Sequence, residues 1–311
     1  MYLQPFVWLG AAALLVAPLS HTQAIVTRDD RPDSEYIARG EQFPSVGSLL
    51  FTNSAGDMFV CSGVLITPEW VLTAAHCVDE AIMETFIVGG NAYVSDRLVP
   101  HPEYTGDLFA GNDIGLVHLS SSVLNVAPSQ LFTGSDELGR LSTSVGFGRS
   151  GNGVTGAVTP PGIKRGADNV LDVFGGGIST TGTGGTLDFT GISPRVVFVD
   201  FDNPRAPGES ATGSTIAANL EGLIAPGDSG GGAAFFEVPD GGGTMSVVAG
   251  IHSFGTSIDG LTNSDYGDLA GYTRVSQHLD FINSTIPEPT AAAFLALSAA
   301  VFLRRPLRRS E

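Results

Sequence analysis

Positive charge is the scarcest property of this 311-residue sequence. Lys164 is its only lysine, and the 15 Lys and Arg residues are outnumbered by 32 Asp and Glu, which gives a formal net charge of −17. Binding to nucleic acid or to anionic membrane surfaces relies on positive charge that is attracted to phosphate groups. The sequence therefore predicts a protein that does not bind nucleic acid.

Cysteines and charged side chains of either sign are also few. Cys61 and Cys77 are the only cysteines, which is too few to staple a small domain, and they are not spaced as a zinc site. Charged residues make up 15% of the chain and hydrophobic residues 42%, so the chain is expected to fold rather than to be disordered. We expect no metal ion and no cofactor.

Glycine and proline are abundant, with 41 and 18 residues, which favours many tight turns between short strands. We therefore expect an all-β fold. The β-rich runs are bounded by Gly, Pro, Asn or Asp and cover residues 47–51, 59–66, 70–73, 114–119 and 195–201. A helical spacing of apolar residues first appears at 275–282 and predicts a short closing helix, while the Gly-, Thr- and Ser-rich stretch 151–191 is typical of loops and hairpins.

The N-terminal segment has the pattern of a secretory signal peptide. Residues 1–24 contain no Lys, Arg, Asp or Glu, the run from Phe6 to Leu19 is apolar, and Ala24 is a small residue at the expected cleavage site. A buried N-terminal helix is the alternative. Removal of this segment by signal peptidase would make residue 25 the start of the mature chain, in a compartment where a disulfide can form.

The C-terminal segment resembles the PEP-CTERM sorting signal of Gram-negative bacteria. Pro-Glu-Pro at 287–289 precedes an apolar stretch at 290–303, and arginines follow at 304, 305, 308 and 309. Fourteen residues form about 21 Å of helix, short of the roughly 20 residues that span a bilayer comfortably. The resemblance implies transient insertion into the membrane and removal by an exosortase; a plain tail anchor is the alternative. We expect a working domain at 25–284, a tail at 285–311, and delivery to the cell envelope, outer surface or extracellular matrix.

Three motifs carry residues suited to acyl transfer. Ser229 lies in Gly-Asp-Ser-Gly-Gly, His76 in Leu-Thr-Ala-Ala-His-Cys, and Asp113 in Gly-Asn-Asp-Ile-Gly-Leu. A serine hydroxyl becomes nucleophilic when an imidazole takes its proton, and the imidazole needs a carboxylate to hold its tautomer. Glycines around Ser229 let the amides of Gly227 and Ser229 point towards a developing oxyanion.

The order His, Asp, Ser, with separations of 37 and 116 residues, resembles the chymotrypsin/trypsin-like serine proteases over about residues 25–282. The resemblance implies two packed six-stranded antiparallel β-barrels with a short C-terminal helix. It also implies a polypeptide substrate, cleaved through an acyl-enzyme. Cys61 and Cys77 match the disulfide by which that family ties the histidine loop to its strand.

The same resemblance assigns residues to substrate binding. Ser253 would lie behind Asp113, and Ser253, Phe254 and Gly255 would offer an edge to which an extended peptide adds as a strand. Leu223 would form the floor of the specificity pocket and Ala270 part of its wall. Since no acid stands at these positions, we expect a preference for a hydrophobic side chain before the cleaved bond.

The resemblance also suggests how the enzyme is activated. Relatives become active when a new Ile-Val N-terminus enters the protein and its ammonium group pairs with the aspartate before the nucleophile. Ile25 directly follows the expected signal-peptidase site, and Asp228 precedes Ser229. Export itself could therefore create the active N-terminus, and Ile25 and Asp228 are the expected activation pair.

Two other functions fit parts of the sequence. Residues 227–231 also satisfy the G-x-S-x-G motif of α/β-hydrolases, although that fold needs a helix after the serine and the order Ser, Asp, His. A catalytically silent surface or matrix-binding protein that keeps the protease fold is the second alternative. It would fail to react with a fluorophosphonate probe.

Overall fold

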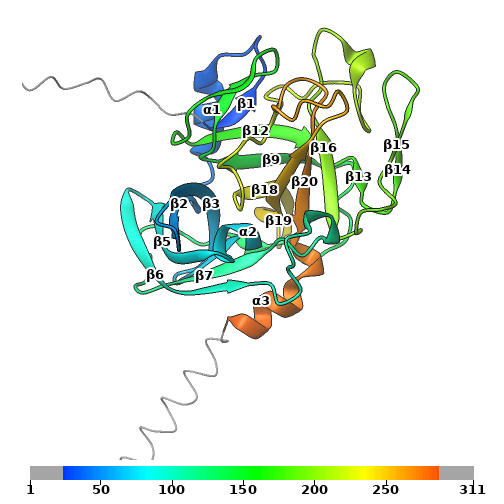
Figure 1. Ribbon diagram of the computed structural model, residues 1–311. Helices are drawn as coiled ribbons and strands as arrows, with labels where there is room; N and C mark the ends of the chain where they lie inside the picture. The colour runs from blue at the N-terminus through cyan, green and yellow to red at the C-terminus, as the bar shows by residue number, and fades with distance from the viewer. Residues whose placement is uncertain (1–23, 287–311) are drawn as a thin grey trace, which may run out of the picture.

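The computed structural model describes residues 24–286, and strands dominate this part of the chain (Figure 1). The N-terminal half forms a closed barrel with the strand order β2-β3-β4-β7-β6-β5. Its strands are β2 (Val46–Asn53), β3 (Met58–Thr67), β4 (Trp70–Thr73), β5 (Ala81–Val88), β6 (Asn91–Pro100) and β7 (Gly115–Leu119). Only Pro68 and Glu69 connect β3 to β4.

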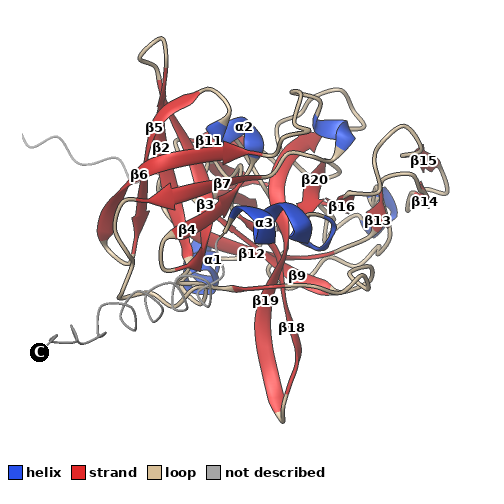
Figure 2. Ribbon diagram, turned by 90° about the horizontal axis from the view of Figure 1, so that it is seen from below, coloured by secondary structure: helices blue, strands red, loops and turns tan. Residues whose placement is uncertain are grey.

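The strands of the second half form one eight-stranded sheet, β12-β9-β18-β19-β20-β16-β13, with β8 added beside β19. They are β8 (Gln130–Leu131), β9 (Leu141–Gly146), β12 (Arg165–Val170), β13 (Val173–Phe174), β16 (Val196–Asp200), β18 (Gly232–Asp240), β19 (Gly243–Thr256) and β20 (Leu269–Arg274). The β18–β19 hairpin extends well beyond the body of the protein (Figure 2). A separate hairpin joins β14 (Ile178–Thr180) to β15 (Thr186–Asp188).

The predicted all-β fold with a short C-terminal helix is confirmed. Helix α3 (Leu279–Thr285) follows a 3₁₀ turn at Val275–Gln277, where the apolar spacing predicted a helix. In detail, the second half pairs as an eight-stranded sheet rather than as a ring of six strands, since β8 and β13 add to it. Residues 24–286 contain no α/β arrangement, which removes the α/β-hydrolase alternative.

Helix α1 (Asp33–Gly40) was not predicted from the apolar spacing. Only Tyr36 and Gly40 of its residues are buried, so it has no apolar stripe long enough to be recognised. It is held by tertiary contacts instead: Arg165 forms an ion pair with Asp33, and a Cβ on Gly40 would lie 2.7 Å from the Arg165 carbonyl carbon. The helix therefore needs glycine where it crosses β12.

The start of the described chain lies inside the protein. Strand β1 (Ile25–Thr27) is sandwiched between β10 (Ser150–Asn152) and β17 (Gly222–Leu223), and β11 (Gly156–Thr159) completes this four-stranded sheet. Ile25 and Val26 are fully buried. This sheet links the N-terminal strand directly to the residues that precede Ser229.

The expected signal peptide and sorting tail lie outside the described residues, apart from the residues at their inner boundaries. Within residues 24–286, no helix has the length and apolar character needed to cross a membrane. The two halves share a core, because Val145, Phe235 and Ile251 of the sheet belong to the same buried cluster as the barrel residues. This shared, close-packed core fixes the position of the two halves relative to each other.

Acidic side chains gather at the end of β16. Asp200, Asp202 and Glu221 are buried there, and the partly buried Asp172 lies beside Asp200. Thr212 donates its hydroxyl to Asp172 Oδ2 at 3.0 Å and its amide to Asp200 Oδ2 at 2.9 Å. A side-chain hydrogen bond also joins Asp172 to Asp200. Burial raises the pKa of Glu221 to about 9 and that of Asp202 to about 7, and it raises the pKa of Asp172 as well.

We predict that the stability of the fold declines as the pH rises from about 4 to about 9. A carboxyl group whose pKa is higher in the folded than in the unfolded state stabilises the fold while it is protonated, and this stabilisation is lost as the pH rises through the folded pKa. Asp172→Asn imitates the protonated acid and should reduce the alkaline loss. Thermal unfolding measured across this pH range tests the prediction, with the exposed Asp240→Asn as control; identical pH profiles for the wild type and Asp172→Asn would contradict it.

Candidate active site

His76 and Asp113 are brought together at one end of the barrel. His76 lies on the single-turn helix α2 (Ala75–Val78) after β4, and Asp113 lies just before β7, which pairs with β4. The His76 amide donates to Asp113 Oδ1 at 2.9 Å, and His76 Nδ1 lies 2.8 Å from Asp113 Oδ2. Because a carboxylate only accepts, Nδ1 carries the proton and Nε2 is left free to accept one.

Asp113 is completely buried, and the second half of the protein supplies two of its contacts. Ser253 donates its hydroxyl to Asp113 Oδ2 at 2.5 Å, and Thr273 donates its hydroxyl to the Asp113 carbonyl at 2.9 Å. Hydrogen bonds to an ionised carboxylate are stronger than neutral ones, and they compensate for its removal from water. Ser253 therefore lies behind Asp113, as the resemblance implies.

Ser229 lies on a turn formed by residues 227–231, called the nucleophile turn below, which packs against β3 and β4. Its carbonyl accepts a hydrogen bond from the Ser62 amide at 2.8 Å, and Cys77 Sγ lies 3.7 Å from the same oxygen. Gly230 has a φ of +75°, and a Cβ there would lie 1.9 Å from Thr73 Oγ1. The turn can approach β4 so closely only because this residue is glycine.

The two expected oxyanion donors make no hydrogen bond within the described part of the protein. Gly227 has a φ of +98°, a conformation that favours glycine. Among the described residues, neither the Gly227 amide nor the Ser229 amide donates a hydrogen bond within the protein. The Gly227 carbonyl accepts a hydrogen bond from the Ser62 hydroxyl at 3.1 Å, which restrains the peptide between Gly227 and Asp228.

Asp228 is a second fully buried carboxylate, and backbone amides surround it. Gly148 donates to its Oδ1 at 2.7 Å, while Ala225 and Ile25 donate to its Oδ2 at 2.8 and 3.3 Å. Burial raises the pKa of Asp228 to about 7, and these amides oppose the rise. The expected activation pair, Ile25 and Asp228, is thus in contact while Ile25 is still joined to Ala24.

The predicted disulfide between Cys61 and Cys77 is present, and the described residues contain no free cysteine. It ties β3 to α2 and so limits the movement of His76. His76 and the two sulfur atoms also lie within 4.8 Å of one another. Because both sulfurs are used in the disulfide, this group offers no thiolates to a metal ion.

The expected pocket residues Leu223 and Ala270 are both buried in one apolar cluster. Leu223 pairs with Val26 in the small sheet, and Ala270 pairs with Val199 in the large one. Ala225 belongs to the same cluster. Leu223 and Ala270 therefore lie in apolar surroundings.

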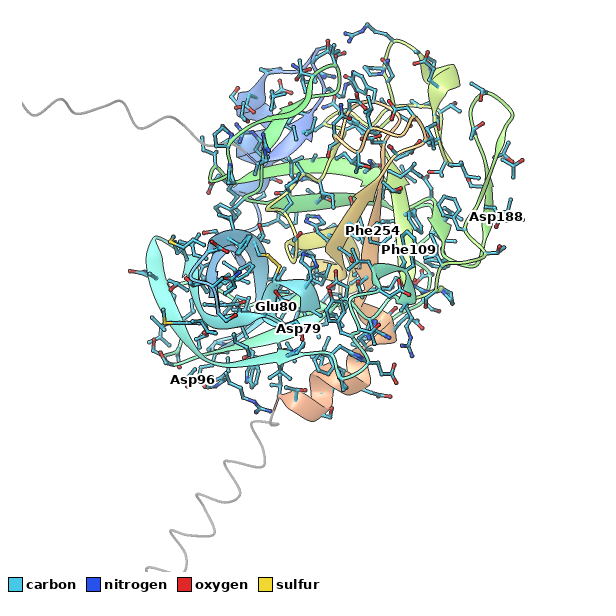
Figure 3. The ribbon with its side chains drawn as sticks, viewed as in Figure 1. Asp79, Glu80, Asp96, Phe109, Asp188 and Phe254 are labelled. Atoms are coloured by element: carbon cyan, nitrogen blue, oxygen red, sulfur yellow. A yellow bond between two sulfur atoms is a disulfide. The ribbon has the colours of Figure 1, made fainter. Side chains whose placement is uncertain are left out.

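The edge formed by Ser253, Phe254 and Gly255 is open on one side. These residues of β19 lie alongside β20, whereas β18 pairs with β19 only from Ile251 towards its start. Phe254 contacts Phe109 edge-to-face with ring centres 5.3 Å apart, and Figure 3 shows the two rings side by side. Both line a cavity of about 290 Å³ that also contains Gly255.

Sequence reasoning missed two residues that shape the site. The Ser62 hydroxyl accepts from the Phe147 amide at 3.0 Å and donates to the Gly227 carbonyl, so it joins the barrel to the nucleophile turn. The Gly148 amide binds Asp228, and a Cβ on Gly148 would lie 2.4 Å from the Asp228 nitrogen. Neither residue belongs to a motif that marks it in the sequence.

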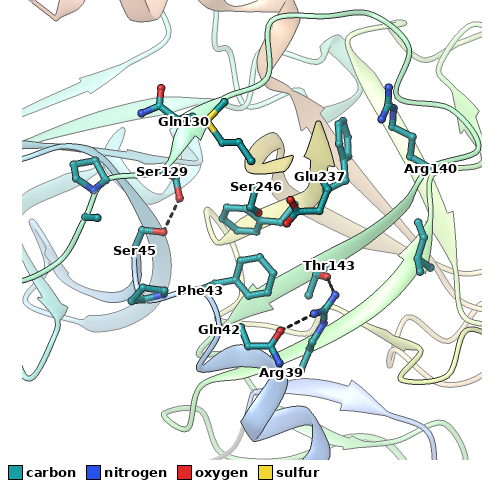
Figure 4. A pocket seen from close by; sticks show the side chains of 17 residues that line it. Arg39, Gln42, Phe43, Ser45, Ser129, Gln130, Arg140, Thr143, Glu237 and Ser246 are labelled. Carbon is teal, nitrogen blue, oxygen red and sulfur yellow. Dashed lines mark hydrogen bonds between the residues drawn. The ribbon is translucent and has the colours of Figure 1, made fainter. Parts of the chain in front are cut away.

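A different cavity, of about 680 Å³, opens between the barrel and the sheet (Figure 4). Arg39 donates to Thr143 at 2.6 Å on one wall, and Ser45 and Ser129 form a hydroxyl pair of 2.7 Å on the other. None of the expected catalytic or substrate-binding residues lines it. The candidate active site is therefore separate from this cavity.

Comparison with known proteins agrees with the geometry. A family model described as Trypsin matches residues 35–166, a segment that includes His76 and Asp113 and ends before Ser229. Brachyurin from Leptuca pugilator is 31% identical over 127 residues, which are 38% of this chain and 50% of that protein. Chymotrypsin-like elastase family member 1 from Homo sapiens is 38% identical over 94 residues, 26% of this chain and 36% of that protein.

These findings support a trypsin-like serine protease domain. The chain spans half or less of the length of these two relatives. A solved structure titled HL collagenase covers 81% of this chain and 98% of its own, with a TM-score of 0.57 and 21% identity. At that identity, the likeness shows a trypsin-like fold and nothing of the substrate.

We predict that Gly230→Ala destabilises the protein by about 3 kcal/mol, because the new Cβ would adopt an unfavourable φ and collide with Thr73 and the Ser62 carbonyl. The matched control is Gly208→Ala, where nothing lies within 4 Å of the added Cβ. Urea unfolding of both variants measures the difference. Equal unfolding midpoints for the two would contradict the close packing of the turn against β4.

Proposed function

We propose that this protein is an exported serine endopeptidase with His76, Asp113 and Ser229 as its catalytic triad. The observation that carries the proposal is the hydrogen-bonded series from His76 through buried Asp113 to Ser253. A serine protease needs such an orienting carboxylate to keep the imidazole in the tautomer that can act as a base. The Trypsin family match over residues 35–166 is independent support.

In this mechanism, His76 Nε2 takes the proton of the Ser229 hydroxyl as its oxygen attacks the carbonyl carbon of the substrate. The amides of Gly227 and Ser229 stabilise the oxyanion that forms. His76 then gives the proton to the leaving amine, which departs as the acyl-enzyme forms. Water, activated by the same histidine, hydrolyses the acyl-enzyme and restores Ser229.

The proposed substrate is a polypeptide with a hydrophobic side chain before the cleaved bond. Support comes from the apolar cluster around Leu223 and Ala270 and from the open edge at residues 253–255. A charged side chain buried among these residues would lose its water without gaining a partner. The extended peptide would add to the open edge through main-chain hydrogen bonds.

We further propose that residues 1–24 are removed on export and that residues 285–311 act as a sorting tail in a Gram-negative bacterium. Signal peptidase and an exosortase would be the processing enzymes, and the tail would enter the membrane transiently. The protease domain at 25–284 would then act at the cell envelope, the outer surface or in the extracellular matrix. The sequence patterns at the two ends of the chain support this proposal.

We predict that Ser229→Ala and His76→Ala each lower kcat/KM for a peptide substrate by about 10⁴-fold or more, because the triad acts as a unit. Asp113→Asn should also lose orders of magnitude through the wrong tautomer. The wild type should be labelled by a fluorophosphonate probe, and Ser229→Ala should not. Ser120→Ala, which changes an exposed serine, is the control.

Near-normal turnover in folded Ser229→Ala would refute this triad. Failure of the wild type to react with the probe or to cleave any peptide would favour a silent binding protein that keeps the protease fold. Circular dichroism of each variant separates loss of catalysis from loss of structure.

For the exported enzyme, we predict a mature chain that begins at Ile25 and lacks the sorting tail. The freed ammonium group would then pair with Asp228, so activity should fall when this amine deprotonates at alkaline pH. Mass spectrometry of protein recovered from the producing cells tests both ends. A different N-terminus in active protein, or full activity of Asp228→Asn, would refute this mode of activation without affecting the triad.

A further inference from the structure

A cavity of about 540 Å³ lies beside His76 on the barrel side of the candidate site. Phe51 of β2 and Phe59 of β3 form part of its wall, and Asp79 and Glu80, directly after α2, form another part. Figure 3 shows Asp79 and Glu80 together in this region. The triad mechanism uses none of these four side chains.

The cavity carries negative charge that no protein cation balances. Asp79 and Glu80 are exposed, and within the described part of the chain neither makes an ion pair or a side-chain hydrogen bond. The residues that line the cavity include no Lys or Arg. Tyr104, which also lines the cavity, has its pKa raised to about 12, chiefly by burial and further by the negative charges of Asp113, Asp79 and Glu80.

The same cavity offers an apolar surface next to these charges. The rings of Phe51 and Phe59 are stacked, with centres 5.1 Å apart and planes 19° apart. Phe59 is 45% exposed although it is a large hydrophobic residue. Arginine and lysine combine an aliphatic stem, which packs on apolar or aromatic surface, with a charged head that carboxylates attract.

The cavity beside His76 is placed to contact the part of a substrate that follows the cleaved bond. Gly106 lines both this cavity and the one formed by Phe254 and Gly255, so the two are neighbours. In the proposed endopeptidase, a peptide on the open edge of β19 would have its cleaved bond at Ser229. The residues after that bond would then lie near β3, whose Ser62 amide binds the Ser229 carbonyl and whose Phe59 lines the cavity together with His76.

We propose that Asp79 and Glu80 select a basic side chain in one of the first two substrate positions after the cleaved bond, with its stem on the Phe51–Phe59 pair. This proposal rests on the proposed endopeptidase function and adds a substrate class to it. The enzyme would thus combine a hydrophobic residue before the cut with an Arg or Lys soon after it. The net charge of −17 attracts cationic peptides to the protein in general. The cavity, in contrast, would favour a basic residue only at particular positions of the substrate.

The test uses quenched fluorescent peptides with a constant hydrophobic residue before the cut and Arg, Ala or Glu at the first or second position after it. For the wild type, we expect kcat/KM for the better Arg peptide to exceed that for its Ala counterpart by about tenfold, which is typical of a few partly exposed charge contacts. The ratio should shrink in 0.5 M salt, because screening weakens exposed pairs. In the double variant Asp79→Asn, Glu80→Gln, the ratio should fall close to one.

A charge-reversed variant, Asp79→Lys with Glu80→Lys, should prefer the Glu peptide to the Arg peptide. The control is Asp188→Asn, which removes one negative charge on the outer β14–β15 hairpin (Figure 3) and should keep the ratio of the wild type. All changes are at exposed positions, so the variants are expected to fold.

Equal rates for the Arg, Ala and Glu peptides, or an Arg preference that survives in both acid variants, would overturn the proposal and leave the endopeptidase function standing. A similar loss of preference in Asp188→Asn would show that net charge, rather than this cavity, is responsible, and it would also overturn the proposal. Failure of the wild type to cleave any peptide or to react with a fluorophosphonate probe would instead refute the proposed function and this proposal with it.

Discussion

The arrangement of the candidate site depends on the buried carboxylate of Asp113. It accepts two hydrogen bonds from His76 of the barrel and one from Ser253 of the sheet. Thr273, also in the sheet, binds its carbonyl. A buried charge is tolerated only when hydrogen bonds replace its water, so the carboxylate requires both halves to be in contact. The same contacts hold the imidazole ready to act as a base.

The position of the nucleophile turn depends in a similar way on segments that are distant in the sequence, through the buried carboxylate of Asp228. Its carboxylate is satisfied by the amides of Ile25, Gly148 and Ala225, which come from three separate parts of the chain. The small sheet that holds Ile25 also contains Leu223, so the N-terminal strand, the expected pocket floor and the residue before Ser229 are mechanically linked. This linkage explains how a change at the N-terminus could reach the oxyanion donors.

Much of the fold was predictable because its signals are local. The strands at 59–66, 70–73 and 114–119 were marked by β-rich runs between turn residues, and each is a strand of the barrel. Helix α1 escaped prediction, since Arg165 and the close approach at Gly40 stabilise it instead of an apolar stripe. The pairing of Cys61 with Cys77 was implied only by the family resemblance, and the structure confirms it.

By itself, the sequence determined the all-β class, the charge of the molecule and the residue types that an acyl-transfer site requires, because composition and short motifs carry that information. Tertiary structure alone decided that Thr273 binds the Asp113 carbonyl, that Ser62 joins the barrel to the nucleophile turn, and that Asp79 and Glu80 share a cavity with Phe59. These contacts join residues far apart in the chain or on different elements. Such contacts depend on how the chain brings distant residues together and buries them. The residues next to a given position in the sequence do not carry that information.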